Sequence, residues 1–192
     1  MIDTTHPIYL ASKSPRRHEI LKNAGFSFQV MKQDSDEIIP SNMMPESIPL
    51  YLSSVKLQSV DTKVDNKIVI CADTLVILLD GFLGKPKNKP EARVMLNQLS
   101  NSTHKVVTGV SISTPSGLIE IVDTSKVTFK KLNSWEIDFY IENFQPFDKA
   151  GSYGIQDFIG MIGVTHIEGS FYNIMGLPIH KVYEALKPFI LK

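Results

Sequence analysis

Residues 10–17 read Leu-Ala-Ser-Lys-Ser-Pro-Arg-Arg and place two hydroxyl groups and two guanidinium groups within one short stretch. The apolar residues 8–10 that lead into it predict a short buried strand. Ser14 suits the N-cap of a helix, and Pro15 suits its first position, where the missing N–H costs nothing. The stretch therefore predicts a strand that passes directly into a helix.

This predicted junction has the chemistry of an anion site. Backbone N–H groups at a helix start lie at the positive end of the dipole, and Arg16 and Arg17 can add bidentate contacts. Two basic residues in a first turn oppose the dipole unless an anion joins them. The alternative is an ordinary cap followed by solvated arginines, and this stretch alone does not separate the two. Phosphate is the natural ligand, with Ser12 and Ser14 as hydroxyl partners.

The next residues predict a helix end, a strand, an acidic loop and a second helix. Gly25 is the expected left-handed stop of the first helix, and residues 26–30 alternate as a strand does. Apolar residues at helical spacing place a second helix over 46–60, after a loop that contains Glu37. Lys56 lies beside the apolar face of this helix. It is either a ligand of the site or, more commonly for such a lysine, a surface residue with its ammonium in water.

The composition is that of a folded globular protein without a broad charged surface. Of the 192 residues, 43% are hydrophobic and 21% are charged, with 20 basic and 20 acidic side chains. The length fits one domain or two closely packed lobes, and the zero net charge argues against nucleic-acid and membrane partners. The single cysteine, Cys71, is expected to be a buried thiol in a reducing compartment. Without a membrane-length apolar run or a signal-like start, the expected localisation is cytoplasmic.

A second informative stretch is the continuous apolar run over 67–74, which predicts a central strand buried on both faces. It ends in Asp73 and Thr74, a carboxylate and a hydroxyl. Residues 75–81 read as another strand and an Asp-Gly hairpin turn, which would return Lys85 towards Asp73. An acid at the end of a buried strand is a good general base or metal ligand, and a turn or N-cap acid is the structural alternative.

The later part of the chain completes a mixed α/β pattern. Two long strands are expected over 106–114 and 119–129, and a closing helix over 179–186. Asn133, with Glu136 three residues later, resembles a capping box at the start of a further helix. The apolar stripe of that helix would consist of Ile137, Tyr140, Ile141 and Phe144.

A third stretch, residues 148–156, reads Asp-Lys-Ala-Gly-Ser-Tyr-Gly-Ile-Gln and fits neither a regular helix nor a plain strand. Its small residues would allow the backbone to approach a ligand closely. A flexible surface loop is the alternative, although Tyr153 and Ile155 supply apolar anchors. The pattern supports these two interpretations about equally.

The absences in the sequence narrow the chemistry further. The five histidines are scattered, so a zinc site made of thiols or imidazoles is not expected. The dinucleotide glycine fingerprint and the hydrolase nucleophile elbow are missing as well. What remains is a set of lysines and arginines with carboxylates suited to a hard cation, which favours phosphate chemistry with Mg²⁺.

Several short motifs follow one another along nearly the whole chain. They are residues 10–17, Ala-Asp-Thr at 72–74, Gly-Lys-Pro at 84–86, His104 with Thr-Gly-Val at 108–110, residues 148–156, and Gly-Leu-Pro at 176–178. In this combination the chain resembles the Maf family of nucleoside triphosphate pyrophosphatases, also called septum formation inhibitor proteins.

The resemblance implies a fold, a cofactor and a reaction. The fold would be a single Maf-like domain over 1–192, mixed α/β and ITPase-like, with a long mixed sheet, flanking helices and two lobes around a central cleft. The cofactor would be a divalent metal cation, Mg²⁺ or Mn²⁺, and the family is often found as a homodimer. The substrate would be a nucleoside triphosphate, hydrolysed to its monophosphate and pyrophosphate.

The resemblance also implies roles for individual residues. Asp73 would be the general base, and together with Glu37 it would serve the metal or the attacking water. Lys85 and Arg16 would act on the triphosphate as catalytic cations, because its hydrolysis needs charge neutralisation more than a covalent nucleophile. The residues expected to bind the substrate are Ser12, Ser14, Arg17, Lys56, Thr74 and Gln156.

The stretch Gly-Ser-Tyr-Gly-Ile-Gln at 151–156 resembles the Maf branch that acts on dTTP and UTP, whereas the 7-methyl-GTP branch carries an acid near position 156. Thymine and uracil present a carbonyl acceptor beside an N–H donor, which one carboxamide can match. We therefore expect Gln156 to read the base, and dTTP, UTP and modified pyrimidine triphosphates to be the substrates. The alternatives are a noncatalytic nucleotide-binding regulator of septum formation, a 7-methyl-GTP enzyme, and an enzyme for non-standard purine triphosphates.

Overall fold

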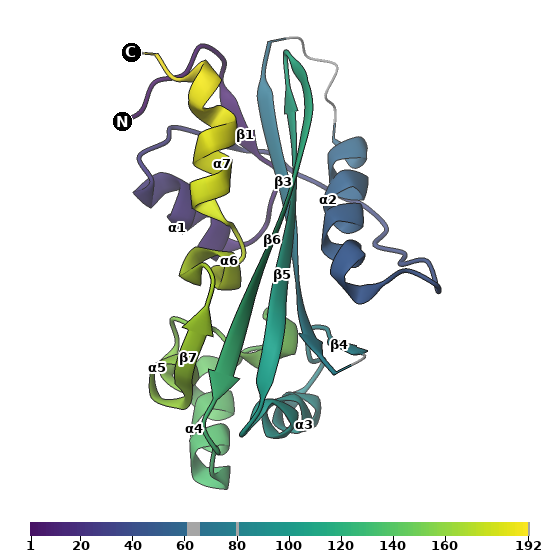
Figure 1. The fold of residues 1–192 in the computed structure, drawn as a ribbon, viewed down its shortest axis with the longest axis vertical. Helices are drawn as coiled ribbons and strands as arrows, with labels where there is room; N and C mark the ends of the chain where they lie inside the picture. Colours follow the sequence, from purple (N-terminus) through teal and green to yellow (C-terminus); the bar gives the residue numbers. More distant parts are fainter. Residues whose placement is uncertain (61–65, 80, 192) are drawn as a thin grey trace. The chain divides into compact units, whose positions relative to one another are not determined.

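The computed structural model describes residues 1–60, 66–79 and 81–191. No helix within these residues has the length and apolar character of a membrane span. Figure 1 shows the helices and strands, which keep its labels below. In chain order they are β1 (Ile8–Leu10), α1 (Pro15–Asn23), β2 (Gln29–Val30), the 3-10 turn η1 (Pro45–Ser47), α2 (Ile48–Ser59), β3 (Ile68–Leu78), β4 (Gly81–Leu83), α3 (Lys89–Leu99), β5 (Thr103–Thr114), β6 (Gly117–Phe129), α4 (Ser134–Phe144), η2 (Ala150–Ser152), α5 (Phe158–Gly163), β7 (Val164–Glu168), α6 (Phe171–Met175), α7 (Ile179–Leu186) and η3 (Lys187–Phe189).

The strands form one mixed sheet. Its order is β2-β1-β3-β5-β6-β7, and β4 pairs with β3 beside this path, which gives seven strands in the described part of the chain. Strand β1 runs parallel to β2 and to β3, with Leu10 opposite Ile70, whereas β4 is antiparallel to β3 and β7 is antiparallel to β6. The mixed sheet and its flanking helices confirm the predicted fold class.

The chain folds into two units, each built from separate segments. Unit 1 consists of Met1–Asp73, Thr108–Asp123 and Gly176–Lys192, and unit 2 consists of Thr74–Val107 and Thr124–Met175. Strands β3, β5 and β6 each continue from one unit into the other. The predicted single Maf-like domain stays a prediction.

Unit 1 packs α1, α2 and α7 onto its part of the sheet. Helices α1 and α7 lie on one side of these strands and α2 on the other (Figure 1). Leu10 and Ile70 of the sheet and Leu21 of α1 are all 0% exposed, so this packing excludes water. Helix α1 begins at Pro15 and is followed by Gly25 at φ +89°, a left-handed conformation that ends helices at little cost for glycine. The predicted strand-to-helix junction is confirmed.

Two predicted elements of unit 1 differ from what their sequence pattern predicts. The strand predicted over 26–30 is reduced to the two residues of β2. The helix predicted over 46–60 begins as the 3-10 turn η1 and becomes α-helical in α2. Pro45 opens this turn, and a proline at a helix start fixes φ without requiring an N–H partner.

Strand β3 is longer than predicted. The sequence predicts a strand that ends in Asp73 and Thr74, and this boundary is wrong because β3 continues beyond both residues. Its second part pairs antiparallel with β4, where Val76 lies opposite Leu83. That ladder satisfies the backbone groups which a free strand end would expose to water. The hairpin itself is confirmed, although Asp80 of its predicted turn lies outside the described residues.

The capping box predicted at the start of α4, in unit 2, is present. Oδ1 of Asn133 accepts from the Glu136 N–H at 2.9 Å, and Oε2 of Glu136 accepts from the Asn133 N–H at 2.9 Å. Ile137 and Tyr140 of the predicted stripe are buried, but Phe144, at the end of α4, is 40% exposed. The buried stripe is therefore shorter than its sequence pattern.

Candidate active site

The junction between β1 and α1 presents polar groups at a helix start. Ser14 occupies the N-cap in an extended conformation, but within the described residues its side chain accepts no capping hydrogen bond. Its N–H donates instead to Oγ of Ser12, at 3.2 Å. Ser12 is buried and Ser14 half-buried. Because the first turn of α1 lacks an acidic residue, its own side chains do not neutralise the positive end of the dipole.

Arg17 ties this junction to the C-terminal segment of unit 1. Its Nε donates to the carbonyl oxygen of Gly176 at 2.7 Å, and its Nη1 donates to Oγ of Ser12 at 3.4 Å. Burial lowers the pKa of Arg17, and the nearby carboxylates of Asp73 and Glu37 act in the opposite direction. Arg17 therefore links two predicted motifs within the unit. The predicted phosphate contacts of Arg17 and of the half-buried Arg16 stay predictions.

Lys56 joins two of the predicted acids in unit 1. Its Nζ donates to Oδ1 of Asp73 and lies 3.1 Å from Oε1 of Glu37. Only 7% of Lys56 is exposed, so the alternative of an ammonium in water is wrong. The side chain of Asp73 is 15% exposed and that of Glu37 is 46% exposed. The structure thus brings these three residues together at a point that a solute can reach from the Glu37 side.

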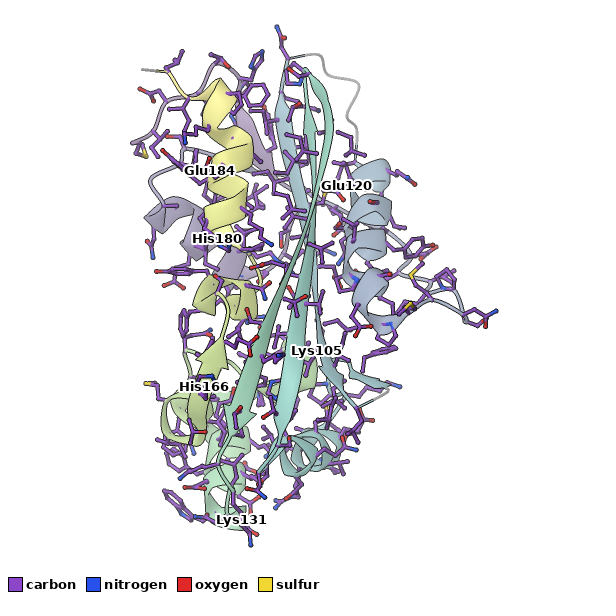
Figure 2. The ribbon with its side chains drawn as sticks, in the orientation of Figure 1. Lys105, Glu120, Lys131, His166, His180 and Glu184 are labelled. Carbon is purple, nitrogen blue, oxygen red and sulfur yellow. The ribbon has the colours of Figure 1, made fainter. Side chains whose placement is uncertain are left out.

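Close packing against the sheet fixes the helix that carries Lys56. A Cβ atom at Gly109 of β5 would overlap the backbone of Leu50, so glycine lets α2 approach the strand. Oγ of Ser54 lies 3.0 Å from Oγ of Ser111 and donates to Oε1 of Glu120 at 3.1 Å. Figure 2 labels Glu120 on the β5–β6 hairpin. These contacts set the rotation of α2 and with it the direction of its last turn.

Asp73 and Thr74 form a polar interruption in an apolar strand. Strand β3 is buried on either side of them, while both residues are half-buried. Cys71, two residues earlier, is 0% exposed, and burial raises the pKa of its thiol to about 12. A thiol with so high a pKa is not a nucleophile near neutral pH, so the predicted role of Cys71 as a buried apolar residue is confirmed. The predicted role of Asp73 as general base stays a prediction.

Thr74, Lys85 and Gln156 belong to unit 2. Thr74 is half-buried, and Lys85 is exposed just after β4. Gln156 is half-buried, and its Oε1 is a buried atom with no hydrogen-bond partner among the described residues. A buried carbonyl oxygen without a partner is destabilising unless water or a ligand satisfies it. The predicted role of Gln156 in base recognition stays a prediction.

The carboxylates of Glu37 and Asp73 are the candidate metal ligands. Mg²⁺ prefers oxygen ligands and is commonly held by one or two carboxylates together with substrate phosphates and water. The described residues contain no group of three or more His, Cys, Asp or Glu side chains arranged to hold a metal. The pair fits an ion that arrives with a triphosphate better than an ion held by protein alone. In Figure 2, His166 lies on β7 and His180 on α7, so these imidazoles belong to different elements.

The sequence interpretation missed a buried hydrogen-bonded cluster in unit 2. Nε2 of His104 and Oη of Tyr153 are 2.7 Å apart, and both residues are buried. Oη of Tyr140 donates to Oδ2 of Asp157 at 2.8 Å. A signal was available for His104, which lies two residues before the buried Val106 and hence on the same face of β5.

A mixed sheet, a helix start without acidic residues and a lysine–carboxylate trio define an α/β protein with charged groups at the edge of a buried strand. A family model described as Maf-like protein matches residues 7–189. The chain belongs to this family.

Several relatives of the chain are named dTTP/UTP pyrophosphatase. One from Parabacteroides distasonis is 45% identical over 186 residues, which cover 96% of each chain. One from Porphyromonas gingivalis is 46% identical over 188 residues, covering 96% of this chain and 94% of the relative. One from Cytophaga hutchinsonii is 42% identical over 180 residues, covering 94% of this chain and 83% of the relative.

Proposed function

We propose that this protein is a nucleoside triphosphate pyrophosphatase that hydrolyses dTTP and UTP to the nucleoside monophosphate and pyrophosphate. The observation that carries the proposal is the contact of Lys56 with Asp73 and Glu37. The start of α1, whose first turn lacks acidic residues, supports it. The names of the relatives, which align over nearly the whole chain, support the choice of dTTP and UTP.

Asp73 is the proposed general base. The reaction breaks the bond between the α- and β-phosphates, and the attacking water must lose a proton as it adds to phosphorus. Lys56 occupies Oδ1 of Asp73, which orients the carboxylate and leaves Oδ2 as the atom that we assign to take this proton. A base fixed within a strand is held more firmly than the exposed Glu37 of the acidic loop.

Cations are proposed to neutralise the triphosphate. Arg16 and Lys56 of unit 1 and Lys85 of unit 2 supply positive charge, and Ser12 and Ser14 supply hydroxyl groups. Glu37 and Asp73 are the predicted ligands of a divalent cation, Mg²⁺ or Mn²⁺, that would neutralise phosphate charge. If Asp73 acts as the base, Glu37 is the carboxylate left to hold this cation.

Gln156 is the proposed reader of the base. Its buried Oε1 lacks a partner among the described residues, and a carboxamide can pair with the adjacent acceptor and donor of thymine or uracil. Replacing Gln156 with Glu keeps the shape but removes the N–H donor, and the carboxylate suits the adjacent donors of a guanine edge. We expect the Gln156→Glu variant to shift preference from dTTP towards 7-methyl-GTP. An unchanged ratio of kcat/KM for these two substrates would refute this assignment.

A nucleotide panel tests the proposed reaction. The full chain is assayed with Mg²⁺ against dTTP, UTP, 7-methyl-GTP, ITP and XTP, and the products are separated by ion-exchange chromatography. The expected result is monophosphate and pyrophosphate from dTTP and UTP, with little product from the purines. Diphosphate and inorganic phosphate as products would refute the reaction class. Absence of turnover with every nucleotide would favour a noncatalytic nucleotide-binding regulator of septum formation.

The proposed compartment is the cytoplasm, in keeping with the fully buried free thiol of Cys71. A homodimer stays a prediction of the family resemblance.

A further inference from the structure

The backbone around Gln156 is packed into unit 2 over most of its length. Gly151 to Ile155 are all buried, so the alternative of a flexible surface loop is wrong. Gly151 adopts φ +67°, and a Cβ atom there would lie 3.1 Å from the side chain of Val76, inside normal contact distance. The N–H of Gly151 donates to the carbonyl of Gly84 at 3.0 Å. The glycine-rich sequence thus serves close packing against β3 and the residues after β4.

Tyr140 of α4 holds this segment on both sides of Gln156. The tyrosine is 0% exposed, and its hydroxyl donates to Oδ2 of Asp157 at 2.8 Å. The hydroxyl oxygen of Tyr140 also accepts a hydrogen bond from the Gly154 N–H at 3.0 Å. Burial, followed by the Asp157 charge, raises the pKa of Tyr140, so the hydroxyl keeps the proton that it donates. One side chain therefore ties together the two residues that bracket 155–156.

The pair formed by His104 and Tyr153 holds the segment on the N-terminal side. Nε2 of His104 lies 2.7 Å from Oη of Tyr153, and the two rings meet edge to face at 5.3 Å. The ring of Phe129 packs against Tyr153 at 5.1 Å and stacks on His104 at 5.9 Å. Burial lowers the pKa of His104 to about 4, so a neutral imidazole meets the tyrosine hydroxyl near neutral pH.

Tyr140 and the His104–Tyr153 pair both hold the backbone next to Gln156. Gln156 follows Tyr153 by three residues and directly precedes Asp157, and its buried Oε1 has no partner within the described residues. If one carboxamide is to recognise a base, the backbone that carries it must be fixed. A small displacement would misalign both its N–H donor and its carbonyl acceptor with the base. Neither Tyr140 nor His104 is needed for the charge neutralisation of a triphosphate.

We propose that Tyr140 and the His104–Tyr153 pair are positioning residues for base recognition, which fix the backbone on both sides of Gln156 so that its carboxamide can select a pyrimidine base. This inference rests on the proposed function, from which it takes the assumption that the base bound near Gln156 is a pyrimidine. It assigns to two buried hydroxyl groups a part in specificity, separate from the groups that bind phosphate.

Nucleotide binding tests the proposal without requiring turnover. Tyr140→Phe and Tyr153→Phe each remove one hydroxyl and keep the ring. Isothermal titration calorimetry with dTMP and, separately, inorganic pyrophosphate is expected to show dTMP affinity reduced by about tenfold, the effect of about one hydrogen bond. Pyrophosphate affinity is expected to stay within twofold. Tyr172→Phe, at a 48% exposed tyrosine of the same unit, is the matched control and should alter neither affinity.

A double-mutant cycle with Gln156→Ala separates positioning from general loosening. If Tyr153 acts through Gln156, then Tyr153→Phe should weaken dTMP binding tenfold in the wild-type background and less than twofold in the Gln156→Ala background. Equal losses in both backgrounds, or equal losses of dTMP and pyrophosphate, would overturn the proposal. So would unchanged dTMP binding in both tyrosine variants. If one variant fails to fold in a thermal scan, the other supplies the test through the same cycle.

The same proteins separate this inference from the proposed function. Wild-type protein that binds dTMP but hydrolyses no triphosphate would refute the proposed reaction and leave the positioning test intact. Wild-type protein that binds pyrophosphate but not dTMP would overturn the positioning proposal, because there would be no base recognition to organise. Active enzyme whose tyrosine variants discriminate normally would overturn the inference alone.

Discussion

Lys56 of α2 donates a hydrogen bond from Nζ to Oδ1 of Asp73 in β3. This contact joins residues 17 positions apart in the chain, and it fixes a carboxylate that the sequence predicts to be a general base. Lys56 is 7% exposed, and a buried ammonium group is costly unless it is paired with opposite charge, which Asp73 and Glu37 provide. The trio is therefore the first target for mutation.

Replacing Lys56 with Met keeps the length of the side chain but removes the ammonium. We expect kcat/KM for dTTP to fall by about 10²-fold or more, because one preorganised charged group typically contributes on this scale. Steady-state kinetics with saturating Mg²⁺ measures the change. Lys131→Met, at an exposed lysine labelled in Figure 2, is the control. Near-normal turnover of the Lys56 variant would show that its contact is structural only.

Replacing Asp73 with Asn removes the proposed proton acceptor while preserving its size. We expect kcat to fall by about 10²-fold or more with the fold retained, which circular dichroism can verify. Glu37→Gln should be milder if Asp73 is the base. If Asp73→Asn turns over almost normally and Glu37→Gln does not, the base is Glu37.

Replacing Arg17 with Lys breaks a geometry that only a guanidinium provides. The Nε bond to Gly176 and the Nη1 contact to Ser12 come from one planar, rigid guanidinium, whose geometry an ammonium on a flexible stem does not reproduce. We expect the free energy of unfolding to fall by roughly 1.5–3 kcal/mol, the value of hydrogen bonds from charged groups, as measured by urea titration. Arg16→Lys should instead raise KM for dTTP. A raised KM in the Arg17 variant and lowered stability in the Arg16 variant would mean that Arg17 binds phosphate and Arg16 is structural.

Buried His104 predicts a pH dependence of stability. Its pKa is about 4 in the folded protein against an ordinary value of 6.5, so between these values the unfolded chain binds a proton that the folded chain does not. The free energy of unfolding should therefore fall by roughly 3 kcal/mol as the pH drops from 6.5 to 4, and recover as it rises. Urea unfolding, followed by fluorescence of the single tryptophan, Trp135, measures the slope.

His104→Gln serves as the comparison, because other titrating groups are the same in both proteins. The variant should be less stable at pH 7 and should show a shallower slope in this interval. Parallel slopes in the two proteins would mean that His104 is protonated in the folded state near its ordinary pKa.

The thiol of Cys71 should not react with alkylating reagents in the native protein. It is fully buried, and the raised pKa of its thiol leaves almost no thiolate near neutral pH. We expect iodoacetamide to label it at a rate that follows unfolding, and completely in guanidinium chloride, as read by mass spectrometry. Rapid labelling of folded protein would contradict this burial.

Local signals in the sequence predicted local structure well. Ser14 and Pro15 mark the start of α1, and Asn133 with Glu136 marks that of α4, because each signal acts within a few residues. The predicted end of β3 is wrong because it depends on a contact outside the strand. Whether a strand stops or continues depends on its partner, here β4, and no pattern within the strand itself contains that information.

The site shows the same division. Helical periodicity placed Lys56 beside an apolar face, but its burial depends on Glu37 and Asp73, which come from a loop and a strand elsewhere in the chain. The His104–Tyr153 pair spans 49 positions and has no local signature. Family resemblance supplied the residue types of the site, whereas only the structure supplied these partners.

Unit 1 is assembled from three segments, of which the last begins at Gly176, and unit 2 from two. Because synthesis starts at the N-terminus, unit 1 cannot be completed before the segment that begins at Gly176 has left the ribosome. The junction between β1 and α1 is tied to this late segment through the hydrogen bond from Arg17 to Gly176. Truncated or stalled chains that lack residues 176–191 should thus be unable to complete this junction, however much of the sheet they contain.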